Sequence, residues 1–184
     1  ELFETDDSAR QTSAVYDGLV TARASSYGEP FAYRPEDRPV MAIDGDAGTA
    51  WRVGDHGQPV GEFIEVTLRS IAVPITSVTL RQPAPPPGGR IVTQVTMSVS
   101  GGEPRLVDLD ERSLEAPGQT IEIDPMASGT TLNVTIEAVS EGDRSLVASR
   151  AGVGFSEIDL GVGPTVELMR PPIDAIEAIG AAPL

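Results

Sequence analysis

The sequence predicts an all-β domain, a sandwich or barrel of about ten short strands. Short runs rich in isoleucine, valine and threonine recur along the 184 residues, and several of them alternate apolar and polar side chains. The 19 glycines and 16 prolines are spread between these runs, where turns between strands need them. Long amphipathic helical stretches are hard to find, which favours the all-β class.

The clearest strand is Phe63–Leu68, in which apolar and polar residues alternate with a period of two. The same reasoning places strands, in chain order, at Val20–Ser26, Phe63–Leu68, Ile75–Gln82, Arg90–Ser100, Arg105–Asp110, Thr120–Asp124, Thr131–Val139, Val153–Leu160 and Thr165–Met169. Residues 83–89 contain four prolines and two glycines, and proline cannot donate ladder hydrogen bonds. We therefore expect an exposed connection there.

The two ends of the chain differ from its middle. Residues 1–19 are polar and acidic and suit an N-terminal arm or a short helix, whereas residues 171–184 fit a C-terminal tail or linker with one or two helical turns. The sandwich itself is expected over residues 20–170. The acidic start resembles a cut inside a longer polypeptide, so we expect an excised domain. No apolar run approaches the roughly 20 residues that a transmembrane helix needs, and no signal peptide is visible.

Composition excludes several classes of function. The formal net charge of −15 argues against binding to nucleic acid or to anionic lipid, which requires clustered positive charge. All 13 basic residues are arginine, a bias typical of a GC-rich coding genome. One histidine and no cysteine exclude Cys/His zinc sites and disulfide frameworks.

The segment Asp44-Gly-Asp46-Ala-Gly-Thr49-Ala-Trp51 is the most informative part of the chain. It brings two carboxylates and a hydroxyl onto a tight turn, and hard cations such as calcium prefer such oxygen ligands. An EF-hand is excluded, because the twelfth loop position is Asp55 where a glutamate is required. Taken alone, the segment slightly favours a surface β-turn in which Asp-Gly-Asp caps the chain reversal.

This motif, followed by Phe63–Leu68 and Ile75–Leu80, resembles the galactose-binding-like jelly-roll fold of discoidin (coagulation factor 5/8 type C) domains and family 32 carbohydrate-binding modules. The resemblance implies a structural calcium ion that a late glutamate, in Phe155-Ser-Glu157, completes. The implied ligands are the side chains of Asp44, Thr49 and Glu157 and the carbonyls of Met41, Asp46, Thr49 and Ser156. Whether Asp46 would use its side chain or its carbonyl stays open.

A narrower resemblance rests on residues 24–39, 51–56 and 152–160, which are similar to the soluble region of actinobacterial cell-wall arabinofuranosyltransferases. Those enzymes are large integral-membrane proteins that transfer arabinofuranose from a polyprenyl-phosphate donor to arabinan. The resemblance implies an extracytoplasmic module tethered through the membrane domain of a parent enzyme. The catalytic membrane core is not in this sequence, so we expect a domain without enzymatic activity.

Several side chains near the calcium motif are candidates for contact with a neutral, arabinan-type glycan. Trp51 is expected in the core beneath the loop, whereas Tyr27, Phe31 and Tyr33 lie in a turn-rich segment and are either exposed or packed into it. We expect Tyr33, Arg34, Arg52 and His56 to form the ligand site. Arg34 could instead form an ion pair with a surface acid, and His56 could instead be a solvent-exposed loop residue without a ligand.

Two other functions remain open at this point. The module could be a scaffold with no glycan ligand, bracing the parent enzyme or contacting a protein partner. A free-standing glycosidase would need two carboxylates that flank the scissile bond, and no pair stands out from the generally acidic composition.

Overall fold

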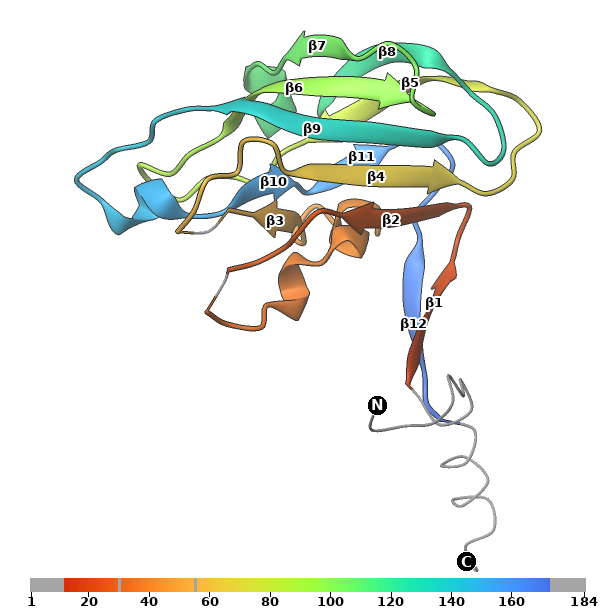
Figure 1. Ribbon diagram of the computed structural model, residues 1–184, viewed down its shortest axis with the longest axis horizontal. Helices are drawn as coiled ribbons and strands as arrows, with labels where there is room; N and C mark the ends of the chain where they lie inside the picture. The colour runs from red at the N-terminus through yellow and green to blue at the C-terminus, as the bar shows by residue number, and fades with distance from the viewer. Residues whose placement is uncertain (1–11, 30, 55, 173–184) are drawn as a thin grey trace, which may run out of the picture. The chain divides into compact units, whose positions relative to one another are not determined.

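The computed structural model describes residues 12–29, 31–54 and 56–172, and it confirms the predicted all-β class (Figure 1). The chain divides into two units: residues 18–165, and a second unit made of residues 1–17 together with residues 166–184. Both candidate sites belong to the first unit. No helix among the described residues is long and apolar enough to cross a membrane.

The unit of residues 18–165 is a sandwich of antiparallel sheets. One sheet has five strands in the order β2-β4-β9-β6-β7, formed by Val20–Ala24, Phe63–Leu68, Thr131–Val139, Val92–Val99 and Arg105–Asp108. The other has three strands in the order β11-β5-β8, formed by Glu157–Asp159, Ile75–Arg81 and Gln119–Met126. A third, shorter pair consists of β3 (Trp51–Val53) and β10 (Val153–Phe155). The described part of this unit also contains short 3-10 turns: η2 (Pro35–Asp37), η3 (Pro39–Ala42), η4 (Glu111–Leu114) and η5 (Val147–Arg150).

The pleat of the central strands builds the core. In β4 and in the first six residues of β9 every second residue is buried, and the register places the buried Ile64 opposite Val134 and Val66 opposite Leu132. Side chains of one face therefore form a continuous apolar layer, as alternation predicts. Trp51 is fully buried, its ring stacks on that of Phe155 at 6.2 Å between centroids, and its predicted core position is confirmed.

Most predicted strands are present with ends shifted by a few residues, and the differences have simple causes. The expected single strand Val153–Leu160 is two strands, because the chain leaves the partner of β10 at Ser156 and joins β5 instead. Strand β3 was not predicted, since three residues are too few for alternation to show. The exposed connection predicted at residues 83–89 joins β5 to β6.

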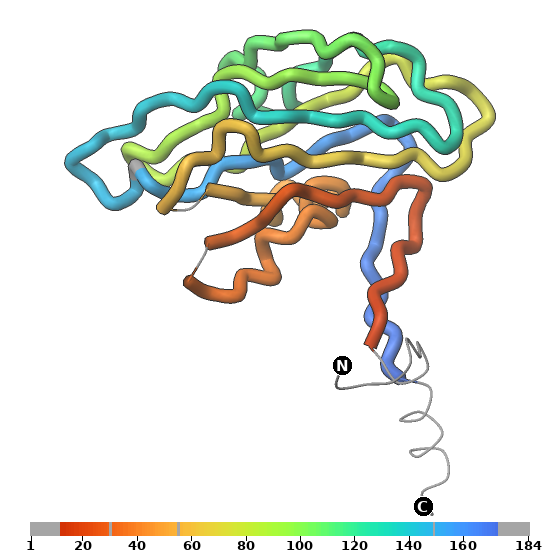
Figure 2. The backbone as a smooth tube through the Cα atoms, in the orientation of Figure 1, coloured from red at the N-terminus to blue at the C-terminus, as the bar shows by residue number. Residues whose placement is uncertain are grey.

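The second unit is a two-stranded antiparallel ribbon. Part of the predicted N-terminal arm forms β1 (Ser13–Asp17), which pairs with β12 (Val166–Arg170), so segments from opposite ends of the sequence run side by side (Figure 2). The helical turns expected after residue 172 lie outside the described residues.

Candidate functional site

The loop between η3 and β3 closes around the hydroxyl group of Thr49. Its Oγ1 atom lies 2.8 Å from the nearer carboxylate oxygen of Asp44 and 2.8 Å from the carbonyl oxygen of Asp46. The carbonyl oxygen of Met41 is 3.4 Å away. A hydroxyl has only one hydrogen to donate, so it cannot satisfy these acceptors together. Oxygen lone pairs from three residues therefore converge on one point.

The side chain of Asp46 has a different role from that of Asp44. Its Oδ1 accepts a hydrogen bond from the backbone N–H of Gly48 at 2.8 Å, which caps the turn, while its carbonyl faces Thr49. Asp44 in turn accepts from the N–H of Asp46 at 2.9 Å. On the question that the sequence left open, the geometry favours the Asp46 carbonyl over its carboxylate as a ligand.

Glu157, the first residue of β11, belongs to the C-terminal part of the unit's sequence and contacts this loop at Gly45. Its Oε1 is buried without a hydrogen-bond partner among the described residues. Burial raises the pKa of the Glu157 carboxyl to about 7, and the nearby charges of Asp44 and Asp159 add to the rise. A hydrogen bond from the Gly45 backbone and the charge of Arg81 act in the opposite direction without cancelling it. Two carboxylates distant in sequence thus repel each other where one of them is partly desolvated.

These oxygens fit a calcium ion by the chemistry of the donor set. An unpartnered buried carboxylate oxygen beside a second carboxylate, a hydroxyl and inward carbonyls is the environment that hard cations favour. Across residues 12–29, 31–54 and 56–172, no three acidic or histidine side chains gather into a metal-binding cluster, so most ligands would have to be neutral oxygens. Ser156, the remaining predicted ligand, is fully buried and its N–H donates to the Arg81 carbonyl at 2.8 Å.

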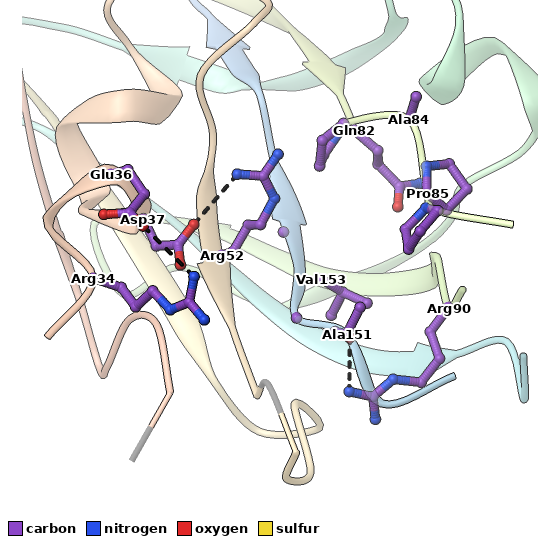
Figure 3. A pocket seen from close by; sticks show the side chains of 14 residues that line it. Arg34, Glu36, Asp37, Arg52, Gln82, Ala84, Pro85, Arg90, Ala151 and Val153 are labelled. Atoms are coloured by element: carbon purple, nitrogen blue, oxygen red, sulfur yellow. Dashed lines mark hydrogen bonds and ion pairs between the residues drawn. The ribbon is translucent and has the colours of Figure 1, made fainter. Parts of the chain in front are cut away.

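A second candidate site is a cavity of about 340 Å³ between η2, the β3–β10 pair and the proline-rich connection (Figure 3). Arg34 and Arg52, two of the four predicted ligand residues, line it together with Glu36 and Asp37. Nη1 of Arg52 donates to Oδ1 of Asp37 at 3.3 Å. Burial raises the pKa of Asp37, and the Arg52 contact only partly offsets it. The cavity wall therefore presents a hydrogen-bond donor, the Arg52 guanidinium, next to an acceptor, the Asp37 carboxylate, in a partly buried position.

The other two predicted ligand residues lie near this cavity without lining it. Tyr33 is 77% exposed on the loop that precedes η2. His56 follows β3, and its Nε2 lies 3.8 Å from Oε2 of Glu29. Arg34 donates through Nε and Nη2 to the other oxygen of the same carboxylate, at 3.1 and 3.0 Å. Glu29, which the sequence did not single out, therefore connects His56 to Arg34.

The β3–β10 pair joins the two candidate sites. Thr49 precedes β3 and His56 follows it, while Ala151 precedes β10 and Glu157 follows it. Because the strands are antiparallel and only three residues long, the Cα atoms at the two ends of each strand are about 7 Å apart. One end carries the calcium candidates and the other carries the walls of the cavity.

No protein-family model matches the sequence, and no curated protein matches it. Among solved structures, arabinofuranosyltransferase AftD from mycobacteria, in a mutant form, superposes with a TM-score of 0.61 at 22% identity over 88% of this chain. The non-mutant AftD structure gives 0.58 at 21% identity. The family 32 carbohydrate-binding module of C. perfringens NanJ, solved with galactose, gives 0.51 at 18% identity over 84% of this chain and all of its own.

The chain spans only 13% of the mutant AftD structure, so the comparison concerns one part of a much longer protein. At these identities the likeness establishes the fold. The chain therefore has the β-sandwich fold of family 32 carbohydrate-binding modules, a fold that it shares with part of an arabinofuranosyltransferase, as its motifs predict.

Proposed function

We propose that this chain is a calcium-stabilised, non-catalytic module that binds a neutral, arabinan-type glycan as part of a membrane arabinofuranosyltransferase on its extracytoplasmic side. The observation that carries the proposal is the β3–β10 pair, which has an oxygen-rich loop at one end and a polar cavity at the other. The sequence resemblance and the shared fold with AftD support the parent enzyme. The location is what the sequence resemblance implies.

Calcium would be held by the side chains of Asp44, Thr49 and Glu157 and by carbonyl oxygens of the same two segments. The ion supplies positive charge that neutralises the repulsion between the two carboxylates and gives Oε1 of Glu157 a partner. This ties the loop before β3 to the strand after β10. Loops that are rigid before binding lose less conformational entropy when a ligand arrives.

The cavity supports a neutral polyol as ligand. A sugar hydroxyl both donates and accepts hydrogen bonds, and the wall offers the Arg52 guanidinium next to the Asp37 carboxylate. Pro85 adds apolar surface across the cavity from Asp37 (Figure 3), and Pro83 and Pro86 also line the cavity. Because the arginines already pair with Asp37 and Glu29, a charged ligand would have to break those pairs. We therefore favour the neutral glycan over an anionic one.

Calorimetric titration with linear arabinofuranosyl oligosaccharides tests glycan binding. The expected dissociation constant is about 1 mM, equivalent to about 4 kcal/mol, since a single tethered module can rely on avidity. Arg52→Ala should weaken binding at least tenfold at a temperature at which the variant is still folded. Arg112→Ala is the control, because it removes an arginine that pairs with an exposed aspartate, Asp110, outside the cavity.

Calcium is tested separately by thermal unfolding with and without chelator. Calcium at 100 times its dissociation constant should stabilise the chain by about 2.7 kcal/mol, which raises the melting temperature by roughly 5–10 °C. Asp44→Ala should abolish that rise, and Asp124→Ala, an exposed aspartate outside the loop, should leave it intact. An unchanged melting temperature after chelation would refute the calcium part of the proposal.

The rival function is a scaffold module, and the titration decides between the two. If wild-type protein produces no heat at 10 mM oligosaccharide while calcium still stabilises it, the fold braces its parent enzyme or a protein partner without a glycan ligand. Turnover of aryl arabinofuranosides by the isolated chain would contradict both readings.

A further inference from the structure

His56 has a backbone conformation that needs support from its surroundings. Its φ angle is +58°, in the left-handed region that residues with a side chain seldom adopt. Such residues persist where neighbouring contacts determine the conformation, and they are enriched at ligand sites. The backbone N–H of His56 donates to the carbonyl of Arg150 at 2.8 Å, which fixes one side of the residue.

Arg90, in the segment just before β6, contacts the backbone around His56. Its Nη1 donates to the carbonyl of Gly57 at 3.1 Å, and its Nη2 donates to the carbonyl of Gly54 at 2.8 Å. The same Nη2 lies 3.2 Å from the carbonyl of Arg150 and 2.9 Å from that of Ala151 (Figure 3). One guanidinium thus holds the carbonyls on both sides of His56 and the carbonyl to which His56 itself donates.

The chemistry of the guanidinium explains why an arginine occupies this place. Four inward carbonyl dipoles repel one another unless a cation lies between them, and charge-assisted hydrogen bonds are stronger than neutral ones. A planar fork reaches several acceptors in fixed directions, whereas a lysine ammonium has three donors on one point charge. Arg90 is therefore more than a surface charge.

We propose that Arg90 is a positioning residue of the glycan site, which holds His56 in its left-handed conformation and so aims the imidazole toward the carboxylate of Glu29. The inference rests on the proposed function and names a residue that acts through His56. Arg90 also lines the cavity. The terminal nitrogens of Arg90 donate to backbone carbonyls. We therefore assign Arg90 a role in the shape of the cavity wall and not in hydrogen bonding to the sugar.

Two measurements test this role on the full chain with Arg90→Lys and with Arg90→Gln as a second variant. Amide hydrogen exchange by NMR should show the His56 amide exchanging at least tenfold faster in both variants, with the Ile136 amide of β9 unchanged. Arg23→Lys is the matched control, since Arg23 forms an exposed ion pair with Glu65 and should alter neither amide.

A double-mutant cycle with an arabinofuranosyl oligosaccharide separates positioning from a general structural effect. Arg90→Lys should lower affinity at least fivefold in the wild-type background and less than twofold in a His56→Ala background. An equal loss in both backgrounds, or an unchanged His56 amide, would overturn the inference while glycan binding stands. Faster exchange without any oligosaccharide binding to wild type would instead refute the proposed function and with it the role of Arg90 in a glycan site.

Discussion

Glu157 should destabilise the metal-free protein at neutral pH, and a single substitution can reveal it. In the folded chain the pKa of its carboxyl is raised from 4.5 to about 7 by burial and by Asp44. The folded state therefore binds this proton more tightly than the unfolded state. The resulting stabilisation is complete below pH 4.5, and it is lost as the pH rises to about 7.

The size of this effect follows from the two pKa values. Each tenfold change in proton affinity corresponds to 1.36 kcal/mol, so the rise from 4.5 to about 7 sets an upper limit of about 3 kcal/mol. Glu157 is only half-buried, and screening by solvent reduces the figure to roughly 1.5 kcal/mol. For a domain of this size that corresponds to about 3–6 °C in melting temperature.

The assay compares wild type with Glu157→Gln by thermal unfolding in chelator between pH 4.5 and 8. The glutamine variant should match wild type at pH 4.5 and exceed it by about 3–6 °C at pH 8, because the variant has no charge to desolvate. Saturating calcium at pH 8 should reverse the order, since only wild type retains the carboxylate ligand. A variant less stable than wild type in chelator at pH 8 would refute the reasoning about Glu157.

Two further predictions concern the framework of the cavity. Gln82→Leu should lower the free energy of unfolding, measured in urea, by about 2–5 kcal/mol. The buried Gln82 amide accepts a hydrogen bond from the Val92 N–H and donates one to the Val92 carbonyl, both at 2.8 Å. Leucine would leave both Val92 groups unpaired. Gln94→Leu, at an exposed hydrogen bond, should cost less than about 0.5 kcal/mol, and a similar cost for both would contradict this account. Gly154→Ala should destabilise the folded domain by about 3 kcal/mol or more, since the new Cβ would lie 2.0 Å from the carbonyl oxygen of Trp51. A Tm within 2 °C of wild type would contradict this, because it would show that β3 and β10 can move apart to accommodate a methyl group.

Local pattern was enough to predict most of the longer strands, because the information lies within each strand. The alternation in Phe63–Leu68 and in most of Thr131–Val139 reports directly which side chains are buried. The break at Ser156 could not be predicted in this way. It depends on which neighbour each half of the segment finds, Trp51–Val53 or Thr79–Arg81, and that choice is made by tertiary packing.

The two candidate sites also differ in how much of each can be predicted from local sequence. Asp44, Asp46 and Thr49 stand together in one recognisable segment of the sequence, whereas Met41, Ser156 and Glu157 were predicted only from the family resemblance. The cavity is different, because Glu29, Asp37 and Arg90 contact their partners across long stretches of sequence. Asp37 lies in the first turn of a 3-10 helix, where acidic residues are common. Nothing in the neighbouring sequence identifies Arg52 as its partner.

The short β3–β10 pair connects the two candidate sites. A pair of three-residue strands has few hydrogen bonds of its own, so packing of Trp51 on Phe155 and contacts at its two ends must fix its position. Calcium would supply the contact at one end, and the Arg90 guanidinium supplies it at the other. Loss of either contact should loosen the same pair. The chelated wild type and Arg90→Lys should therefore show faster exchange at the same amides of β3 and β10, and disjoint sets of affected amides would show that the two ends are independent.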